Sequence, residues 1–312
     1  MKFFCYLLIG MIVGHYALNL ISPGIISLSP DLRLFALIVI LARAGLALNI
    51  GDLKKIGYRA LFISFIPPSL ELMAVILIAP MIFSISHIEA AMLGAVLCAV
   101  SPAVVVPRML RMLKNDIATK KGIPQLIMTG TSLNGVFAVC LFVLFMGIAT
   151  DGNDSSIILR GGVFPLSTVV AGTLILRFVP NFADKLSKIL TKLWIPTEFM
   201  LFVLVGAAMD LSNVIDIGFV SVLLIAVALL IRIITMIICL FDTPLNFKER
   251  LFCAVAYLPK ATVQAAIGGT ALAVGLESGR VILTVAVLAI LITAPLGALA
   301  IDLMSRRMSF DE

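Results

Sequence analysis

The 312-residue chain has few charged side chains, only two histidines and a single tryptophan. Charged residues make up 13% of the sequence and hydrophobic residues 62%, and the mean hydropathy is +1.18. A soluble protein of this length could not bury so much apolar surface, so the composition excludes a soluble enzyme. The net charge of +6 is dispersed between apolar runs. We therefore attribute it to membrane topology and expect no nucleic-acid partner.

Motifs for metals, cofactors and catalysis are also missing. His15 and His87 are far apart in sequence, and no pair of cysteines has the spacing of a metal site. The five cysteines lie inside apolar runs, so we interpret them as buried free thiols: Cys5, Cys98, Cys140, Cys239 and Cys253. No catalytic triad or phosphate-binding loop is recognisable. The sequence therefore predicts neither an enzyme nor a bound metal or cofactor.

Long apolar runs dominate the chain instead. Ten of them approach the roughly 20 residues that a membrane span needs. They lie near 2–22, 33–50, 60–84, 88–111, 124–148, 157–178, 194–212, 218–240, 250–275 and 280–303. The first run has no small-x-small cleavage site, so we interpret it as a helix and not as a signal peptide. The pattern predicts an all-α polytopic membrane protein with about ten transmembrane helices.

The loops between these runs alternate in charge. Basic loops carry Lys54, Lys55 and Arg59, then Arg108, Arg111, Lys114, Lys120 and Lys121, then Arg177, Lys185, Lys188 and Lys192, and the tail carries Arg306 and Arg307. The alternate loops, 84–89, 149–160 and 210–217, contain few basic residues. Positive charge marks the cytoplasmic side of a membrane protein. We therefore expect a multi-pass protein of the plasma membrane with both termini in the cytoplasm.

Two of the apolar runs contain proline at mid-depth. They read LCAVSPAVVVP at 97–107 and FCAVAYLPKATVQ at 252–264, and they share a Cys-Ala-Val triplet. Proline interrupts a helix, and the freed carbonyls are tolerated in hydrocarbon only where they line a protein or water-filled cavity. Paired interrupted segments indicate an inverted-repeat transporter. We expect one repeat at 60–148 and the other at 218–303, each with a discontinuous helix, and these two helices should cross. Residues 2–50 and 157–212 would form scaffold helices. The alternative is that the two apolar strings are similar by chance.

Several strings resemble the cation–proton antiporter superfamily, and in particular its sodium/proton exchanger branch. They are ILARAGLALNIGDLKKIG (40–57), AVSPAVVVPRML (99–110), KKGIPQLIMTGTSLNGVFAV (120–139), LFVLVGAAMDLS (201–212) and KERLFCAVAYLPKATVQAAIGG (248–269). The resemblance covers nearly the whole chain as one domain, 1–312. It implies a core of two crossed, broken helices beside a dimerisation domain, an elevator-like movement, a homodimer in the lipid bilayer, and exchange of sodium or another monovalent cation for protons.

The chain departs from this family in two places. The adjacent acids that bind the cation and protons in the family correspond to Asn134 and Gly135. Two further helices are expected between the equivalents of 157–178 and 194–212, but Leu176 leads almost directly into the basic stretch before Trp194. The resemblance thus implies a shortened member without the acidic pair, whose ion site would contain Asn134, Gly135, Ser101, Pro102, Thr131, Ser132, Lys260 and Thr262.

Ionisable residues inside the spans are few, and a charge at mid-membrane is costly enough to make each one a functional candidate. Glu71 and Arg232 lie in the first helix of each repeat, so we interpret them as a buried ion pair, with Glu71 as a titrating carboxylate as the alternative. The resemblance implies that Lys260 neutralises a half-helix dipole, and participation in proton coupling is the alternative. We interpret Arg43 as a snorkelling side chain or an interhelical partner, and not as a gate of the transport pathway.

The other side chains expected at the crossing are uncharged, so the sequence does not determine whether the chain exchanges ions. Ser101, Thr131, Ser132, Thr262 and Gln264 would supply oxygen atoms there, although each alone is more often a helix-packing group. Sodium in a low-dielectric site needs a counter-charge, which Asn134 and Gly135 do not provide. Three hypotheses follow: an antiporter with reduced or lost activity, a carrier of small organic anions with the same fold, and a non-transporting homologue.

Overall fold

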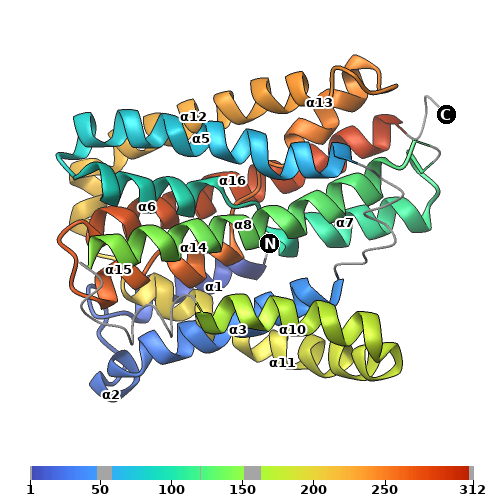
Figure 1. Ribbon diagram of the computed structural model, residues 1–312. Coiled ribbons are helices and arrows are strands. Elements are labelled where there is room, and N and C mark those ends of the chain that lie inside the picture. The colour runs from blue at the N-terminus through green and yellow to red at the C-terminus, as the bar shows by residue number, and fades with distance from the viewer. Residues whose placement is uncertain (1, 48–57, 120, 151–162, 309–312) are drawn as a thin grey trace.

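The computed structural model describes residues 2–47, 58–119, 121–150 and 163–308, and all regular structure in these ranges is helical (Figure 1). Lys54, Lys55, Lys120, Asp151, Asp154 and Arg160 lie outside the described residues. The helices are α1 (Lys2–Val13), α2 (Pro23–Ser27), α3 (Ser29–Ala47), α5 (Tyr58–Phe83), α6 (His87–Cys98), α7 (Pro102–Lys114), α8 (Ile123–Ala149), α10 (Phe164–Phe178), α11 (Pro180–Ala207), α12 (Leu211–Cys239), α13 (Phe247–Ala256), α14 (Thr262–Ile267), α15 (Thr270–Ala273) and α16 (Gly279–Met308).

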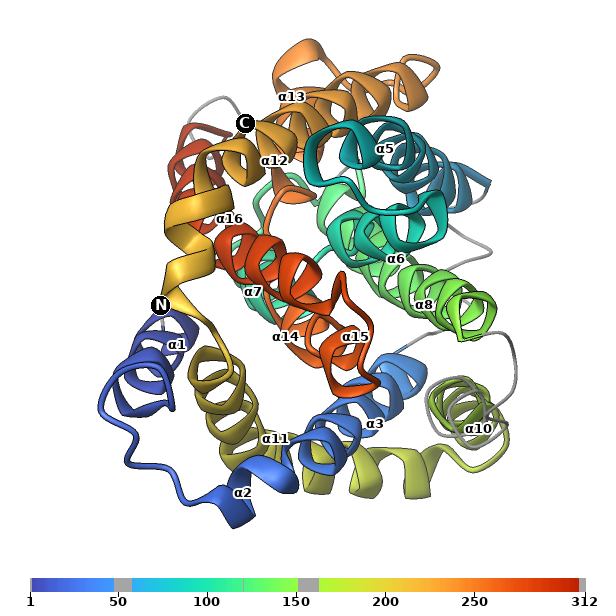
Figure 2. The same cartoon turned by 90° about the vertical axis from the view of Figure 1, so that its left-hand side faces the viewer.

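The helices form two groups, which Figures 1 and 2 show one beside the other. In the first group, α1 packs against α11, and α3 packs against α10 and α11. In the second group, α5 contacts α6 and α12, α6 contacts α8, and α12 contacts α16. Helix α14 bridges the two groups, because it contacts α3 of the first group and α16 of the second. The residues predicted to form the ion site lie on α7, α8 and α14 and in the segments directly before α7 and α14.

Small residues bring α1 and α11 close together. A Cβ atom at Gly10 would lie 2.2 Å from the carbonyl oxygen of Val203, and one at Gly206 would lie 2.2 Å from that of Leu7. Only glycine allows the two backbones to approach this far, as is common where membrane helices associate. The first helix group is therefore held by direct backbone contact.

Membrane character is clear in the exposed surface and in the helix lengths. Six stretches of the described chain are helical, long and apolar enough to cross a membrane: 59–83, 87–114, 123–149, 180–207, 214–239 and 279–308. Met81 is 86% exposed and Phe219 is 84% exposed, although both are large and apolar. Hydrocarbon is the environment in which such side chains are stable. The chain is therefore an all-helical membrane protein.

Two of the expected spans end earlier than the sequence predicted. The first was expected at 2–22, but α1 ends at Val13, and the amide of Asn19, itself in the left-handed region at φ 51°, bonds to the carbonyl of Gly14. The runs at 88–111 and 250–275, each expected to be interrupted, are divided into α6 and α7 and into α13, α14 and α15. The span expected to end at 212 ends at Ala207, because Asp210 already caps α12 by accepting from the amide of Ser212.

The basic stretch 177–193 was expected to be a loop, and this was wrong. Only Val179 separates α10 from α11, and α11 begins with Pro180 at its first turn. Proline at this position has no amide to lose, and lysine and leucine are good helix formers. The basic residues therefore extend a transmembrane helix and do not interrupt it.

Candidate functional site

Two interruptions of the helices lie against each other in the second helix group. Helix α6 ends at Cys98, Ala99 and Ser101 are extended, and α7 begins with Pro102. The second interruption separates α13 from α14 at 257–261. The amide of Ser101 donates to the carbonyl of Pro259 at 2.9 Å, and the hydroxyl oxygens of Ser101 and Thr262 are 3.5 Å apart. The two breaks thus form one continuous region of non-helical backbone.

Side chains from other segments satisfy the backbone groups that the first break frees. Asn134 on α8 accepts from the amide of Val100 at 2.7 Å and donates to the carbonyl of Cys98 at 3.2 Å. Gln264 on α14 donates to the carbonyls of Val96 and Ala99, both at 2.8 Å. A buried backbone group without a partner costs about 1–3 kcal/mol. These two amides therefore make the interruption of α6 tolerable.

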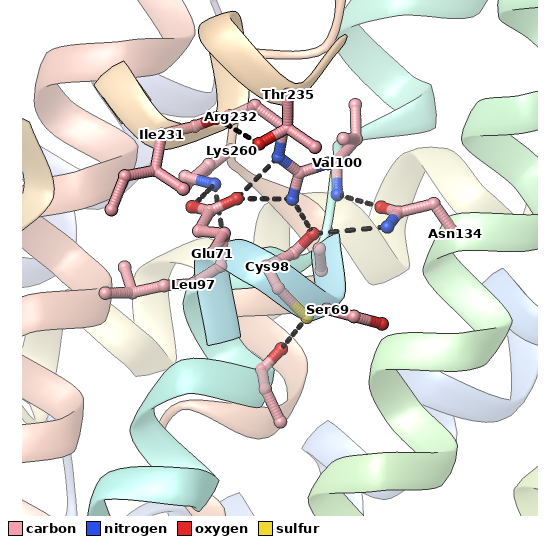
Figure 3. A network of polar contacts seen from close by, with 12 residues as sticks. Ser69, Glu71, Leu97, Cys98, Val100, Asn134, Ile231, Arg232, Thr235 and Lys260 are labelled. Carbon is pink, nitrogen blue, oxygen red and sulfur yellow. Dashed lines mark hydrogen bonds and ion pairs between the residues drawn. The ribbon is translucent and has the colours of Figure 1, made fainter. Parts of the chain in front are cut away.

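A cluster of three charges lies beside this break (Figure 3). The Glu71 carboxylate on α5 accepts from Arg232 Nε on α12 at 2.5 Å and also contacts Arg232 Nη2. Its other oxygen accepts from Lys260 Nζ at 2.8 Å. All three side chains have an exposed fraction of 0%. One carboxylate is shared by two cations, so the cluster carries a net charge of +1.

The C-terminal end of α6 offsets the surplus positive charge. Arg232 donates to the carbonyl of Cys98, and Lys260 donates to the carbonyl of Leu97. The last carbonyls of a helix carry partial negative charge, and cations are stabilised beside them. Lys260 thus contacts both Glu71 and the C-terminal end of α6, and its pairing with Glu71 was not predicted from the sequence. The contacts of both Glu71 oxygens with the two cations hold the Glu71 side chain in place.

Asn134 and Gly135, to which the family resemblance assigns the acidic pair, are both uncharged. Both oxygen and nitrogen of the Asn134 amide are used by the backbone of the break. A Cβ atom at Gly135 would meet nothing within 4 Å. Glu71 is the only buried Asp or Glu among the residues that the structure describes. Every other carboxylate among the described residues is at least partly exposed.

The hydroxyl groups proposed for the site fall into two classes. Thr131 donates to the carbonyl of Ile127 at 2.7 Å, and Ser132 donates to that of Met128 at 3.1 Å, so both hydroxyls bond to their own helix. Ser101 and Thr262 instead face each other across the two breaks. The structure thus places Ser101, Thr262, Lys260 and Asn134 at or beside the two breaks.

Two further arginines, Arg43 and Arg33, lie on α3 away from the two breaks. Arg43 on α3 lies over the ring of Trp194 on α11, with its guanidinium carbon 5.4 Å from the ring centre. Arg33 is buried at the start of α3, and sequence reasoning missed it because the span was expected to begin there. The signal was available, since an arginine among Leu32, Leu34 and Phe35 is unusual in an apolar run. No group of three or more His, Cys, Asp or Glu suited to a metal occurs within the described residues.

Comparisons with known proteins agree on one family. The family model described as "Sodium/hydrogen exchanger, transmembrane" matches residues 3–195 and 182–306. Sodium/hydrogen exchanger 9B1 from Homo sapiens is 31% identical over 347 residues, with 90% of this chain and 67% of the relative covered. Sodium/hydrogen exchanger 9B2 from Xenopus tropicalis is 32% identical over 345 residues and is covered to 64%. The chain thus spans about two thirds of the length of these relatives.

The fold is similar to that of a solved antiporter. The sodium proton antiporter MjNhaP1 from Methanocaldococcus jannaschii superposes with a TM-score of 0.75 at 15% identity, covering 98% of this chain and 92% of that one. The alignment with the human relative includes positions that this chain does not fill. Because 90% of 312 residues is about 281, an alignment of 347 positions leaves about 66 positions that only the relative fills. The two family matches overlap at 182–195, within α11.

Proposed function

The chain belongs to the sodium/hydrogen exchanger family, and from this membership we propose that it is a secondary transporter of the alternating-access type whose cation site has lost its titrating acid. Residues 60–148 and 218–303 would be the inverted repeats, and 2–50 and 157–212 the scaffold. The order of helices supports this: α5, the α6–α7 break and α8 correspond to α12, the α13–α14 break and α16. The contact between Ser101 and Pro259 supports a crossing of the two broken helices.

One observation carries the proposal that exchange is weak. The space beside Gly135 has no carboxylate, and the buried Glu71 is already bound by two cations. A sodium ion entering this region would meet neutral oxygens from Asn134, Ser101, Thr131, Ser132 and Thr262 and a surplus positive charge. Dehydrated sodium needs a counter-charge in a low-dielectric site. Proton-coupled sodium exchange should therefore be slow in this chain, and Gly135 is the position at which it is limited.

Topology and assembly follow from the same family. The basic side chains Arg111, Lys121 and Arg306 belong to helix ends at the side of the molecule where α16 ends in Figure 1. Their charge supports a cytoplasmic location for this side and for both termini in a plasma-membrane protein. A homodimer is proposed from the family resemblance. Tags at each terminus, tested for protease access in sealed vesicles, and cross-linking in membranes would check orientation and dimer formation.

A gain-of-function experiment tests the proposed cation site. The protein, Gly135→Asp and the neutral control Gly135→Asn are reconstituted in vesicles, and internal pH is followed after a sodium gradient is imposed. We expect little proton movement with the unchanged protein and with Gly135→Asn, and a clear gain with Gly135→Asp. A carboxylate at mid-membrane costs about 2.5–3.5 kcal/mol on insertion scales. The free space at Gly135 and the net positive cluster should let the variant fold.

The same vesicles discriminate the alternatives. Robust sodium-driven proton movement by the unchanged protein would contradict the proposal, and Glu71→Gln would then be examined first. A carrier of small organic anions is the second candidate, favoured by the net charge of +1 on Glu71, Arg232 and Lys260. Uptake of labelled acetate without sodium would support it. Vesicles in which neither the unchanged protein nor Gly135→Asp moves either ion would indicate a non-transporting homologue.

A further inference from the structure

Arg33 is a buried cation without a counter-ion at the boundary between the two helix groups. Its side chain starts from the first turns of α3 and is only 6% exposed. Arg33 Nη2 donates to the carbonyl of Leu204 on α11 at 3.4 Å, and Nε has no hydrogen-bond partner. Among the residues that the structure describes, no carboxylate forms an ion pair with it. A buried charge in this state is costly unless something else pairs with it.

Cavities lie on both sides of the Arg33 side chain. The larger has a volume of about 550 Å³ and the smaller about 210 Å³, and Arg33, Pro30 and Gly269 line both. The hydroxyl of Ser29, which also lines the larger cavity, is buried and has no partner. Tyr16 and Leu20, at 46% and 69% exposure, lie at its rim, so the larger cavity opens to the surroundings. A volume of this size is typical of sites for small organic molecules.

Glycine at position 269 makes room for the guanidinium. A Cβ atom there would lie 1.8 Å from Arg33 Nη1 and 2.9 Å from Arg33 Cζ. Gly269 joins α14 to α15 and has an ordinary right-handed conformation, so the close approach is the feature that requires glycine. Figure 2 shows α3 and α11 adjacent to α14 and α15. The guanidinium is thus held between the first helix group and the second.

We propose that the larger cavity is a binding site for an amphiphilic anion, with its carboxylate or phosphate group on Arg33 and its apolar chain along the cavity wall. The unpartnered Nε of Arg33 and hydroxyl of Ser29 supply donors for the head group, and Leu20, Leu204 and Leu272 supply apolar surface for the chain. Charge-assisted hydrogen bonds from a guanidinium to such an anion are among the strong ones. This site is separate from Gly135 and does not depend on the proposed function.

Binding is measured on the full chain in a neutral maltoside detergent, with laurate as the anionic probe and dodecanol as its neutral analogue. A ligand that binds the folded state raises the unfolding temperature with its concentration. We expect laurate to raise it in a saturable way and dodecanol to have little effect. Equal effects of laurate and dodecanol, or no saturable effect of laurate with no bound phospholipid, would overturn the proposal.

Three variants locate the site. Arg33→Gln should weaken laurate binding about tenfold or more, because charged hydrogen bonds are lost. Gly269→Ala keeps the charge but displaces the guanidinium, and it should weaken binding in the same direction. Arg43 is a cation on the same helix that lines neither cavity, so Arg43→Gln should bind laurate like the unchanged protein. If Arg33→Gln does not fold, Gly269→Ala and the comparison of laurate with dodecanol still test whether the anion binds at Arg33. Unchanged laurate binding in Arg33→Gln or in Gly269→Ala would contradict the proposed site.

A second arm identifies the source of the anion. The protein is incorporated in phosphatidylcholine vesicles with or without phosphatidylglycerol, extracted, and examined by native mass spectrometry. Retained phosphatidylglycerol that is lost in Arg33→Gln would assign the site to a membrane phospholipid. Laurate binding without retained phosphatidylglycerol would assign it to a free amphiphile.

Discussion

Replacing Glu71 by glutamine is expected to destabilise the protein more than replacing either cation that it binds. The reason is the charge count of the cluster, which has one carboxylate and two cations, all with an exposed fraction of 0%. Glu71→Gln leaves Arg232 and Lys260 buried without a counter-charge. Lys260→Met or Arg232→Met leaves a balanced pair in each case. Destabilisation should therefore be largest for Glu71→Gln.

The expected magnitudes follow from the contacts. Removing one partner of a buried ion pair costs about 3–5 kcal/mol, and Glu71 serves two partners, so we expect about 5 kcal/mol for Glu71→Gln. Lys260→Met keeps the Glu71–Arg232 pair and removes the donor to the Leu97 carbonyl, for which we expect about 1–3 kcal/mol. At about 2 °C per kcal/mol for a chain of this size, the unfolding temperatures of the two variants should differ by about 4–8 °C.

The assay is the unfolding temperature of each purified variant in one detergent, with the monodisperse fraction as a second readout. Asp302→Asn is the matched control, because this carboxylate pairs with Arg108 at 3.1 Å but has a side chain that is 36% exposed. Exposed pairs contribute about 1 kcal/mol or less. Two results would refute the reasoning: Lys260→Met as damaging as Glu71→Gln, or Glu71→Gln no worse than Asp302→Asn.

Three further changes test packing and hydrogen bonding by the same measurement. Asn134→Ala should cost about 1–3 kcal/mol because the amide of Val100 loses its partner, whereas an unchanged stability would show that water replaces the side chain. Gly130→Ala places a Cβ atom 1.8 Å from the Tyr257 hydroxyl and should lower the stability by about 1–3 kcal/mol. Adding Tyr257→Phe should recover most of this stability, since the next atoms are 3.2 Å from the Cβ position. Gly10→Leu should separate α1 from α11 and lower the yield of folded protein, whereas Gly24→Leu, which meets nothing within 4 Å, should not.

Proline alone did not determine where the helices break. Pro67, Pro80, Pro196 and Pro295 all lie inside continuous helices, whereas Pro102 begins a new helix at a break. A break inside the membrane persists only where other groups satisfy the freed carbonyls. Here those groups come from distant segments. The two breaks were predicted from their prolines, but proline alone does not explain why Pro67 and Pro295 leave their helices continuous.

The charge cluster was only partly predictable from the sequence. A lone acid and a lone base in apolar spans need partners, and this indicated contact between Glu71 and Arg232. The sequence did not indicate that Lys260 also binds the same carboxylate, because its position depends on how the second break approaches α5. The basic stretch 177–193 was misjudged for another reason: charge indicates the side of the membrane, but it does not distinguish a loop from a helix.

Helix α11 is longer than a bilayer core is thick, and this sets the depth at which its neighbours lie. Its 28 residues extend about 42 Å at 1.5 Å per residue, compared with about 30 Å of hydrocarbon. Lys185, Lys188 and Lys192 share one face of its first half, at the level where phosphate groups would lie. Displacement of α11 along the membrane normal would pull these ammonium groups into hydrocarbon, and this cost opposes such a movement of α11 and of the helices packed on it. Any sliding during a transport cycle would then fall to the group that contains the two breaks.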